Sequence, residues 1–322
     1  MKGEVFNQST WIVLKVADLY YKKNMTQQEI ADLLKISKST VSRLLKRAVK
    51  ENVVSFVIEQ PYAECLELEK ELKKKYGLKE VIVVPITEDQ ENEEEVKKAV
   101  ALEGARYIQR IITPEDILGI AWGGTMYYLI QYLNPCQKTE ASFVTLHGSL
   151  SCCDYELDVH TLVSRMAMAF GGKRYALISE GLMDSKASIQ MLLQEESIKR
   201  VFSLFNKITI SVSGIGSFYP EATSPLSRLE YLKPEDFNEL REKGVYGDLM
   251  LRFFDKNGRE CDSSLRDRTL AIDLDVYRRI PCKIIAASGT HKAETINAAL
   301  KGDLIDILIV DFHLAQVISN LR

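Results

Sequence analysis

Residues 26–50 read TQQEIADLLKISKSTVSRLLKRAVK, and this stretch predicts two short helices joined by a tight turn. Thr26 suits the N-cap of the first helix, because Glu29 follows three residues later at the spacing of a capping box. Lys35-Ile36-Ser37 interrupts the apolar pattern and predicts the turn, from which Ser37 can cap the second helix. The apolar stripe of the first helix consists of Ile30, Leu33 and Leu34. The pattern is that of a helix-turn-helix.

The two faces of the second helix differ in chemistry. Val41, Leu44, Leu45 and Ala48 repeat on one face, which should pack on the first helix. The opposite face carries hydroxyls and cations, with no carboxylate before Glu51. Such donors suit base edges and phosphates, and the start of the second helix is the part that meets bases. The residues expected to contact DNA are Thr26, Gln27, Lys38, Ser39, Thr40, Ser42, Arg43 and Arg47.

Charge separates the chain into two parts. Residues 1–60 hold ten lysines and arginines against six acidic residues, whereas the rest of the chain holds 32 against 39. A basic part on an acidic body is typical of a phosphate-binding module attached to a ligand-binding body. The alternative, an ordinary helical hairpin with a solvated charged face, explains this separation less well.

The flanking segments complete a small first domain. Residues 9–22 predict a preceding helix, and residues 53–58 predict a strand, the wing of a winged variant. Pro61 then closes the domain. The side chains of the preceding helix that are available for the small core are Trp11, Leu14, Ala17, Leu19 and Tyr21. We therefore expect a DNA-binding domain at 1–60 and a second domain at 61–322.

Composition limits the class of protein. The chain has 322 residues, of which 46% are hydrophobic and 27% charged, which suits two ordinary globular domains. It has no apolar run of about 18 residues, the length that a membrane span needs, and no signal-peptide pattern at its start. We expect a cytoplasmic protein. Cysteines and histidines lack metal spacing, so we expect neither metal nor cofactor; a zinc site of His147, Cys152 and His160 is a weak alternative.

Beyond residue 61, apolar strands alternate with helices. The helix at 62–76 should end at Gly77, and a strand should follow at 80–85. Further strands are expected at 117–121, 142–146, 174–178, 208–212, 283–287 and 305–310, and helices at 93–112, 124–133, 158–170, 186–205, 291–300 and 312–321. This alternation implies an α/β fold with a doubly wound, mostly parallel sheet. Residues 249–261 break the rhythm, and Asn257-Gly258 indicates a hairpin turn there.

Four strands end in loops of small residues, those at 117–121, 142–146, 208–212 and 283–287. Ligands of open parallel sheets lie beyond the carboxyl ends of the strands. Glycine lets the backbone approach a ligand, and the start of the next helix offers free N–H groups to an anion. The candidate ligand-contacting residues are Gly123, Gly124, Thr125, His147, Gly148, Ser149, Gly214, Gly216, Asp248, Ser288, Gly289 and Lys292.

Three of these candidates have two interpretations each. Lys292 is a natural phosphate partner beside a helix start, or else a surface lysine. Asp248, with Arg252 and Asp255, could bind sugar hydroxyls, or it serves the hairpin backbone. His147 could donate or accept a hydrogen bond at a hydroxyl or phosphate oxygen, or it is satisfied by its own loop. Dinucleotide-binding and P-loop patterns are absent from the sequence.

Four stretches together, MTQQEIADLLKISKSTVSRLLKRA, GIAWGGTM, YGDLMLRFFDKNG and SGTHKAETINAAL, resemble the SorC family of bacterial transcriptional regulators over essentially the whole chain. The resemblance implies a winged or homeodomain-like DNA-binding domain followed by a phosphosugar-binding domain similar to phosphosugar isomerases. It also implies tetramers on palindromic operators and a phosphorylated sugar or polyol as effector. By motif, Gly123, Gly124 and Thr125 match the phosphate-contacting loop, and Lys292 matches the lysine after the C-terminal loop. His147-Gly148-Ser149 matches a third ligand-lining loop, while the family's glycine pair is Ser288-Gly289 here.

We therefore expect a sugar-responsive transcriptional regulator that is not an enzyme. The effector would shift the protein between DNA-competent and DNA-incompetent assemblies, with a coupling free energy of ~1–3 kcal/mol. The alternative is a phosphosugar isomerase or deaminase with an accessory DNA-binding domain, although no paired carboxylates with a nearby histidine stand out at the strand ends. A third reading is an oligomerisation domain without a ligand. Because the His147 loop offers an imidazole and no amine, we expect noncovalent effector binding.

Overall fold

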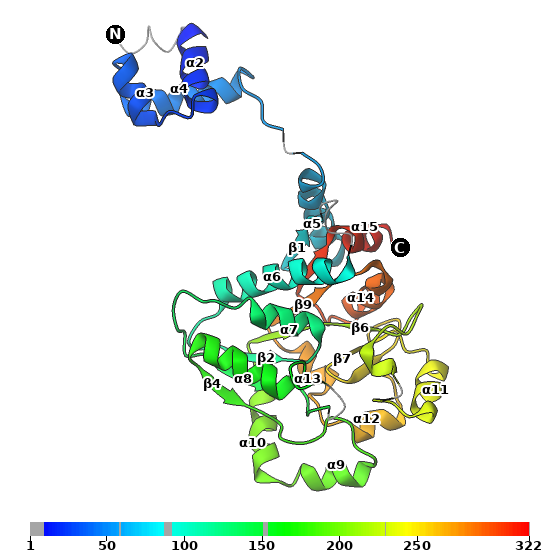
Figure 1. The fold of residues 1–322 in the computed structure, drawn as a ribbon. Coiled ribbons are helices and arrows are strands. Elements are labelled where there is room, and N and C mark those ends of the chain that lie inside the picture. The colour runs from blue at the N-terminus through cyan, green and yellow to red at the C-terminus, as the bar shows by residue number, and fades with distance from the viewer. Residues whose placement is uncertain (1–9, 58, 87–91, 151–153, 229, 322) are drawn as a thin grey trace. The chain divides into compact units, whose positions relative to one another are not determined.

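The computed structural model describes residues 10–57, 59–86, 92–150, 154–228 and 230–321 (Figure 1). Contacts divide the chain into two units, Met1–Glu59 and Gln60–Arg322. The boundary expected after residue 60 lies beside this division. Within the described ranges, no helix combines the length and the apolarity that crossing a bilayer requires.

The first unit is helical. Its elements are α2 (Thr10–Ala17), a π-helical turn η1 (Asp18–Lys22), α3 (Gln27–Leu34) and α4 (Lys38–Lys50). The predicted inner face of α4 is confirmed, since Val41, Leu44, Leu45 and Ala48 are all buried. On α3, the prediction was wrong for Leu33, which is 56% exposed, while Ala31 is buried instead.

The buried face of α2 differs from the expected one. Ala17 and Leu19 are buried as predicted, but Trp11, Leu14 and Tyr21 are exposed. The core side chains of α2 are instead Ile12, Val13 and Val16. Apolar residues surround almost the whole of this helix, so periodicity alone does not select the face that packs on α4.

The expected wing is absent from the described residues 53–57, where the chain forms turns and irregular backbone. The N–H groups of Val53 and Val54 donate to the carbonyl of Ala48 at 2.9 and 3.1 Å, so these residues close the end of α4. Phe56 and Val57 are exposed, and Ile58 lies outside the described residues. A strand requires a partner strand, and the described residues of this unit provide none.

The second unit is built on a parallel sheet with the strand order β1-β10-β9-β5-β2-β3-β4. All neighbouring pairs in it are parallel. Its strands are β1 (Glu80–Val84), β2 (Ile117–Ile120), β3 (Ser142–Thr145), β4 (Lys173–Tyr175), β5 (Ile210–Ser213), β9 (Cys282–Ala287) and β10 (Ile307–Asp311). Each is a predicted strand, with ends displaced by at most three residues. The predicted α/β class is confirmed.

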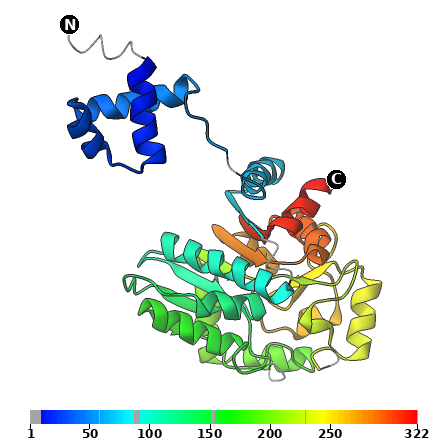
Figure 2. The same cartoon turned by 45° about the horizontal axis from the view of Figure 1, so that its top comes forward.

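Helices cover both faces of this sheet (Figures 1 and 2). One face packs on α6 (Glu93–Ile111), α7 (Gly124–Gln131) and α8 (Val159–Phe170). The other packs on α5 (Tyr62–Tyr76), α10 (Glu196–Phe205), α13 (Leu274–Arg278), α14 (Ala293–Lys301) and α15 (Phe312–Asn320). The remaining helical elements are α9 (Lys186–Leu192), α11 (Pro234–Glu242), α12 (Ser264–Arg268), η2 (Pro225–Ser227) and η3 (Thr290–Lys292). The helix expected at 186–205 is thus two helices, α9 and α10.

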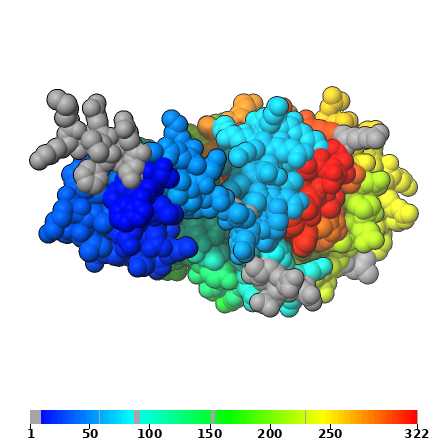
Figure 3. Space-filling model, turned by 90° about the horizontal axis from the view of Figure 1, so that it is seen from above, coloured from blue at the N-terminus to red at the C-terminus, as the bar shows by residue number. Residues whose placement is uncertain are grey.

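Helix α5 lies beside the last helix, α15, as the space-filling view shows (Figure 3). The Lys75 ammonium donates to the carbonyl oxygens of Ile318 and Ser319 at 3.3 and 2.8 Å, and so satisfies carbonyls that the end of α15 leaves free. Near the other end of α5, Gln316 donates to the Glu64 carboxylate at 2.8 Å. The first and last helices of this unit are therefore held together along their length.

A small antiparallel sheet of β6 (Gly216–Ser217), β7 (Gly247–Leu249) and β8 (Arg252–Phe254) interrupts the alternation. The predicted turn at Asn257-Gly258 is present and is closed by a bridge between Phe254 and Glu260. The sequence did not indicate the turn between β7 and β8, which Met250 and Leu251 make at φ 50° and 66°. Both residues are apolar and buried. Turns are predicted from Gly, Pro, Asn, Asp and Ser, so this pair gave no signal in the sequence.

The strand order places the candidate loops at one edge. Strands β9, β5, β2 and β3 are consecutive neighbours, so the loops at their carboxyl ends lie in a row. The direction of winding reverses between β2 and β5, since β3 and β4 continue to one side of β2 while β5, β9 and β10 continue to the other. Such a reversal opens a crevice in which doubly wound proteins bind ligands.

Candidate functional site

Two side-chain caps hold the helix-turn-helix. The Thr26 hydroxyl accepts a hydrogen bond from the Glu29 N–H at 3.3 Å, and the Glu29 carboxylate accepts one from the Thr26 N–H at 2.8 Å, which completes the predicted capping box. At the start of α4, the Ser37 hydroxyl accepts from the Thr40 N–H at 3.1 Å. Lys35, at φ 57°, turns the chain between the helices. These contacts fix the direction in which α4 leaves the turn.

The outer face of α4 presents hydroxyls and cations. Lys38, Ser39 and Arg43 are exposed, and Thr40, Ser42 and Arg47 are half-buried. The Arg43 guanidinium donates to the Thr40 hydroxyl at 3.4 Å, so these two donors lie together near the start of the helix. Arg47 pairs with Glu51 at 2.6 Å, which compensates part of its charge. Gln27 is half-buried in the first turn of α3.

The loop after β2 leads directly into α7. Gly123 has φ 121°, which favours glycine, and a Cβ at this position would meet nothing within 4 Å. The N–H groups in the first turn of a helix have no partner in the helix itself. Thr125, in this first turn, is only 7% exposed. The start of α7 therefore offers donors to a bound group.

His147, in the loop after β3, is fully buried. Its Nε2 accepts a hydrogen bond from the Trp122 N–H at 3.1 Å, so the proton lies on Nδ1, which donates to the Gly148 carbonyl at 2.7 Å. Burial lowers the pKa of His147 to about 4, against the opposing hydrogen bond to Gly148. Of the two roles left open for His147, these contacts favour the one in which the loop backbone satisfies the ring.

The next two residues of this loop also contact protein atoms. A Cβ on Gly148 would lie 2.6 Å from the Ser179 carbonyl oxygen, so the close approach of residues 179–181 requires glycine here. The Ser149 N–H donates to the Ser179 carbonyl at 2.8 Å, and the Ser149 hydroxyl donates to the carboxylate of Asp158. His147, Gly148 and Ser149 thus shape the edge of the crevice, and the side chains of His147 and Ser149 contact the protein itself.

Asp248 lies in β7, beside the loop after β5. It is 5% exposed and accepts a hydrogen bond from the Ser224 hydroxyl at 2.7 Å. Gly216 is its cross-strand neighbour, and a Cβ there would collide with the Asp248 carboxylate. Burial raises the pKa of Asp248 to about 6, while the Ser224 hydrogen bond and the charge of Lys292 oppose this rise. A Cβ on Gly214 would meet nothing within 4 Å, so this loop borders open space.

The loop after β9 carries Lys292, which is half-buried and whose ammonium makes no ion pair or hydrogen bond within the described chain. Burial, and then the charge of Lys97, lower the pKa of Lys292 to about 8, while Asp248 and Asp311 act in the opposite direction. The carboxylate of Asp311 accepts a hydrogen bond from the Gly289 N–H at 2.9 Å. Ser288, in the same loop, is 7% exposed.

The sequence did not identify Lys97, Ser224 or Asp311 as part of this region. Two residues that it did suggest are engaged elsewhere. The Arg252 guanidinium donates to the carbonyls of Ile272 and Ala271 at 3.2 and 2.8 Å and pairs with Glu260, so it supports the fold. The carboxylate of Asp255 accepts from the N–H groups of Asn257 and Arg259, within the predicted turn.

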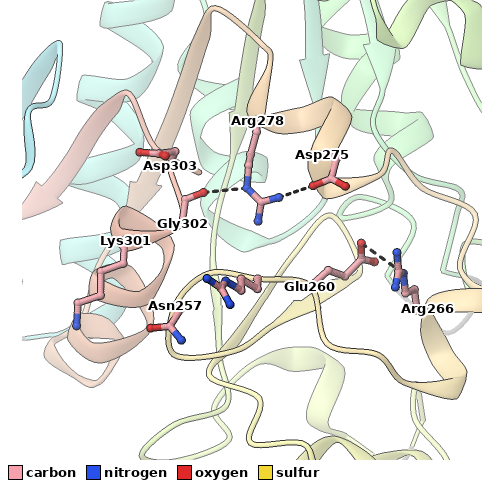
Figure 4. Close-up of a pocket in the computed structure, with 9 residues that line it drawn as sticks. Asn257, Glu260, Arg266, Asp275, Arg278, Lys301, Gly302 and Asp303 are labelled. Carbon is pink, nitrogen blue, oxygen red and sulfur yellow. Dashed lines mark hydrogen bonds and ion pairs between the residues drawn. The ribbon is translucent and has the colours of Figure 1, made fainter.

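A shallow hollow of about 400 Å³ lies at the opposite edge of the sheet, before β9 and β10 (Figure 4). Its central side chain, Arg278, donates to the carbonyls of Gly302 and Gly258 and pairs with Asp275. Each of the three guanidinium nitrogens therefore already donates to a group of the protein. No cluster of metal-ligating side chains occurs in the described part of the chain, and Cys152 of the suggested zinc site lies outside it.

The comparisons with known proteins cover both units. Residues 60–320 match the family model described as "Putative sugar-binding domain", and residues 15–51 match that of Sigma-70, region 4, a helix-turn-helix region. The chain is 31% identical over 308 residues to the deoxyribonucleoside regulator of Bacillus subtilis (strain 168), covering 95% of this chain and 96% of the relative. It is 30% identical over 309 residues to the sorbitol operon regulator of Klebsiella pneumoniae, covering 95% and 97%.

The fold agrees with these relatives. The crystal structure of the full-length sorbitol operon regulator SorC from Klebsiella pneumoniae has a TM-score of 0.76 and 29% identity, covering 97% of this chain and 99% of that one. The sequence match and the structural match both extend over the helix-turn-helix and the parallel sheet. The chain belongs to the SorC family of bacterial transcriptional regulators, with a DNA-binding helix-turn-helix and a sugar-binding domain.

Proposed function

We propose that a phosphorylated sugar or polyol, bound at the carboxyl edge of the parallel sheet, controls the affinity of this regulator for its operator. The observation that carries the proposal is the set of groups at the crevice between β2 and β5. A half-buried lysine stands there without a partner in the described residues, beside a buried threonine and a buried aspartate. Such groups are costly to bury unless a ligand satisfies them.

The parts of the effector have distinct partners in this proposal. The first turn of α7, with Gly124 and Thr125, and the Lys292 ammonium bind the phosphate. Asp248 accepts hydrogen bonds from sugar hydroxyls, and Gly123, Gly214 and Gly216 let the backbone approach the ligand. Ser288 and Gly289 complete the loop that carries Lys292, and His147, Gly148 and Ser149 shape the far edge of the site.

DNA binding is assigned to the first unit, residues 1–60, and effector binding and oligomerisation to residues 61–322. The polar face of α4 enters the major groove, where Lys38, Ser39, Thr40, Ser42 and Arg43 contact bases or phosphates, with Arg47 further along the helix. Thr26 and Gln27 contact the DNA backbone from the start of α3. The resemblance to the family favours a tetramer on a palindromic operator.

The experiment combines effector screening with operator binding. Phosphorylated sugars and polyols, each with its unphosphorylated counterpart, are added to the full chain during thermal unfolding. A phosphorylated compound should raise Tm, because a ligand that binds only the folded state stabilises it. The same compound should change the affinity for an operator selected from random duplexes. If only unphosphorylated compounds act, the phosphate assignment is wrong.

Lys292→Ala provides the matched test of the site. The substitution should abolish the response of operator affinity to the effector. Operator affinity without the effector should survive, because Lys292 lies outside the helix-turn-helix. A variant that keeps its response would show that the phosphate binds elsewhere.

The second candidate function is a phosphosugar isomerase or deaminase with an accessory DNA-binding domain. The fold of the second unit favours it, and the raised pKa of Asp248 suits proton transfer. Against it, both nitrogens of His147, the histidine nearest to the strand ends β2 and β3, are hydrogen-bonded to backbone. Conversion of the Tm-raising sugar phosphate by the full chain would favour the enzyme.

A further inference from the structure

Lys97 belongs to α6, and its side chain lies over the start of α7. Its sequence context, EEEVKK, is that of a solvated helix face. Helix α6 packs along α7 (Figure 1). As a result, a Cβ built on Gly124 would lie 3.9 Å from the Lys97 Nζ. The ammonium therefore stands over the first turn of α7, beside Gly124.

Two side chains hold Lys97 in this place. The Glu94 carboxylate pairs with the Lys97 Nζ at 2.6 Å through one oxygen. Its other oxygen accepts a hydrogen bond of 2.5 Å from the Tyr128 hydroxyl, and Tyr128 belongs to α7. The hydrogen bonds from Lys97 and Tyr128 lower the pKa of Glu94, so the carboxylate stays ionised and remains bound to both side chains.

A second cation, Lys292, lies within electrostatic range of Lys97. Lys292 comes from the other side of the crevice, and after burial the charge of Lys97 is the largest cause that lowers its pKa. The carboxylates of Glu93, Asp248 and Asp311 also act on Lys292, so the region is of mixed charge. Two ammonium groups that repel each other beside a helix start are an arrangement that a dianionic ligand would stabilise.

We propose that Lys97 is a second cationic contact for the anionic group of the effector, and that Glu94 and Tyr128 position it at the start of α7. This inference rests on the proposed function, since it concerns the same site. Anion binding draws the ammonium from Glu94 toward the ligand. The pair of lysines also sets specificity, because a phosphate dianion can use both cations and an uncharged sugar can use neither.

Inorganic phosphate is the probe, titrated calorimetrically into the full chain at constant ionic strength, with chloride as the balancing salt. Lys97→Met keeps the length of the side chain and removes its charge. This variant should bind phosphate about tenfold or more weakly, as expected for the loss of a charge-assisted hydrogen bond. The control is Lys199→Met, which removes another lysine that pairs with a glutamate three residues earlier, on the helix α10. The control should bind phosphate as the unmodified protein does.

Glu94 also competes with the ligand for the ammonium, and this competition gives a second, opposite signature. Glu94→Gln keeps an amide oxygen that can hold the ammonium near α7 but removes the competing charge, so phosphate affinity should rise by about twofold, the size of a partly exposed helix ion pair. The gain should vanish in the double variant with Lys97→Met. A purely structural Lys97 would produce neither the gain nor its loss.

The outcomes separate the two levels of the proposal. If Lys292→Met weakens phosphate binding while Lys97→Met binds like the unmodified chain, this inference is overturned and the effector site stands. If the unmodified chain binds no phosphate at all, both the inference and the phosphate part of the proposed function fail. Weaker phosphate binding in both Lys97→Met and Lys292→Met, with unchanged binding in the control, supports the inference.

Discussion

The carboxylate of Asp311 accepts a hydrogen bond of 2.9 Å from the backbone N–H of Gly289, which stands at φ 95°. The other carboxylate oxygen accepts one of 2.9 Å from the Leu314 N–H and so caps α15. One buried side chain at the end of β10 thereby fixes both the last helix and the loop that carries Lys292. Asp311 positions the site, and its own oxygens are occupied by the protein.

Asp311→Asn replaces one acceptor oxygen by a donor, which leaves a buried N–H of the loop or of α15 unpaired. We expect a loss of ~1–3 kcal/mol in the free energy of unfolding, the cost of an unsatisfied buried group. Urea denaturation measures it. The effector response should weaken as well, because the backbone before Lys292 loses its anchor. An unchanged unfolding midpoint would contradict the importance of these two hydrogen bonds.

Arg43→Ala should weaken operator binding by ~1–3 kcal/mol if the guanidinium makes a bidentate base contact. Operator affinity of the unmodified chain should also fall steeply with salt, because phosphate contacts release counterions. Fluorescence anisotropy on a selected operator measures both. Arg106→Ala, an exposed arginine paired with Glu103 on α6, is the control for loss of one positive charge. Equal operator affinities for all three proteins would show that Arg43 on α4 does not contact the operator.

The buried imidazole of His147 predicts a loss of stability in mild acid. Its pKa is about 4 in the folded chain against an ordinary 6.5, so the unfolded chain binds the proton more readily between these values. The contribution of His147 to stability should therefore fall by roughly 3 kcal/mol as pH drops from about 6.5 to 4. Asp248, whose pKa is raised to about 6, acts oppositely, since its protonation favours the folded state as pH falls toward 3.8.

Thermal unfolding across this pH range, for the unmodified chain and for His147→Gln, separates the two contributions. The variant cannot titrate at this position, so its Tm should fall less in acid. Parallel curves for the two proteins would show that His147 does not control the acid response.

Binding of the effector should be reversible and noncovalent. An aldehyde sugar forms an imine only with an unprotonated amine, and the His147 loop supplies an imidazole instead. The pKa of Lys292 is lowered to about 8, which still leaves the ammonium as the main species at neutral pH. Borohydride treatment of the complex, followed by intact-mass measurement, should reveal no adduct. A stable increase in mass, mapped to Lys292, would refute this prediction.

The sequence predicted the parts of the structure that depend on local pattern. The capping box at Thr26, the inner face of α4 and the parallel strands follow from short-range spacing. The predicted wing is absent from the described residues 53–57 because β-branched residues favour a strand only where another strand can pair with them. Trp11 was placed in the core wrongly because α2 has apolar residues on opposite faces.

The sequence suggested the glycines and Lys292 of the candidate site, because strand-to-helix loops can be located from the sequence. Lys97 was not, because its place over Gly124 depends on how α6 packs on α7. The contact of Asp311 with the Lys292 loop was not predictable either, because an aspartate after an apolar strand indicates only a helix cap. The backbone contacts of His147 required the relative positions of the β2 and β3 loops, which no local pattern contains.

The pairing of α5 with α15 brings the start and the end of the second unit together. Glu64, near the start of α5, accepts its hydrogen bond from Gln316, in the middle of α15. A linker that runs along α5 from the end of α15, with new ends opened in an exposed loop, should therefore yield a circular permutant that keeps the sheet and its crevice. Fluorescent proteins fused at such ends would turn this unit into a reporter for its own effector.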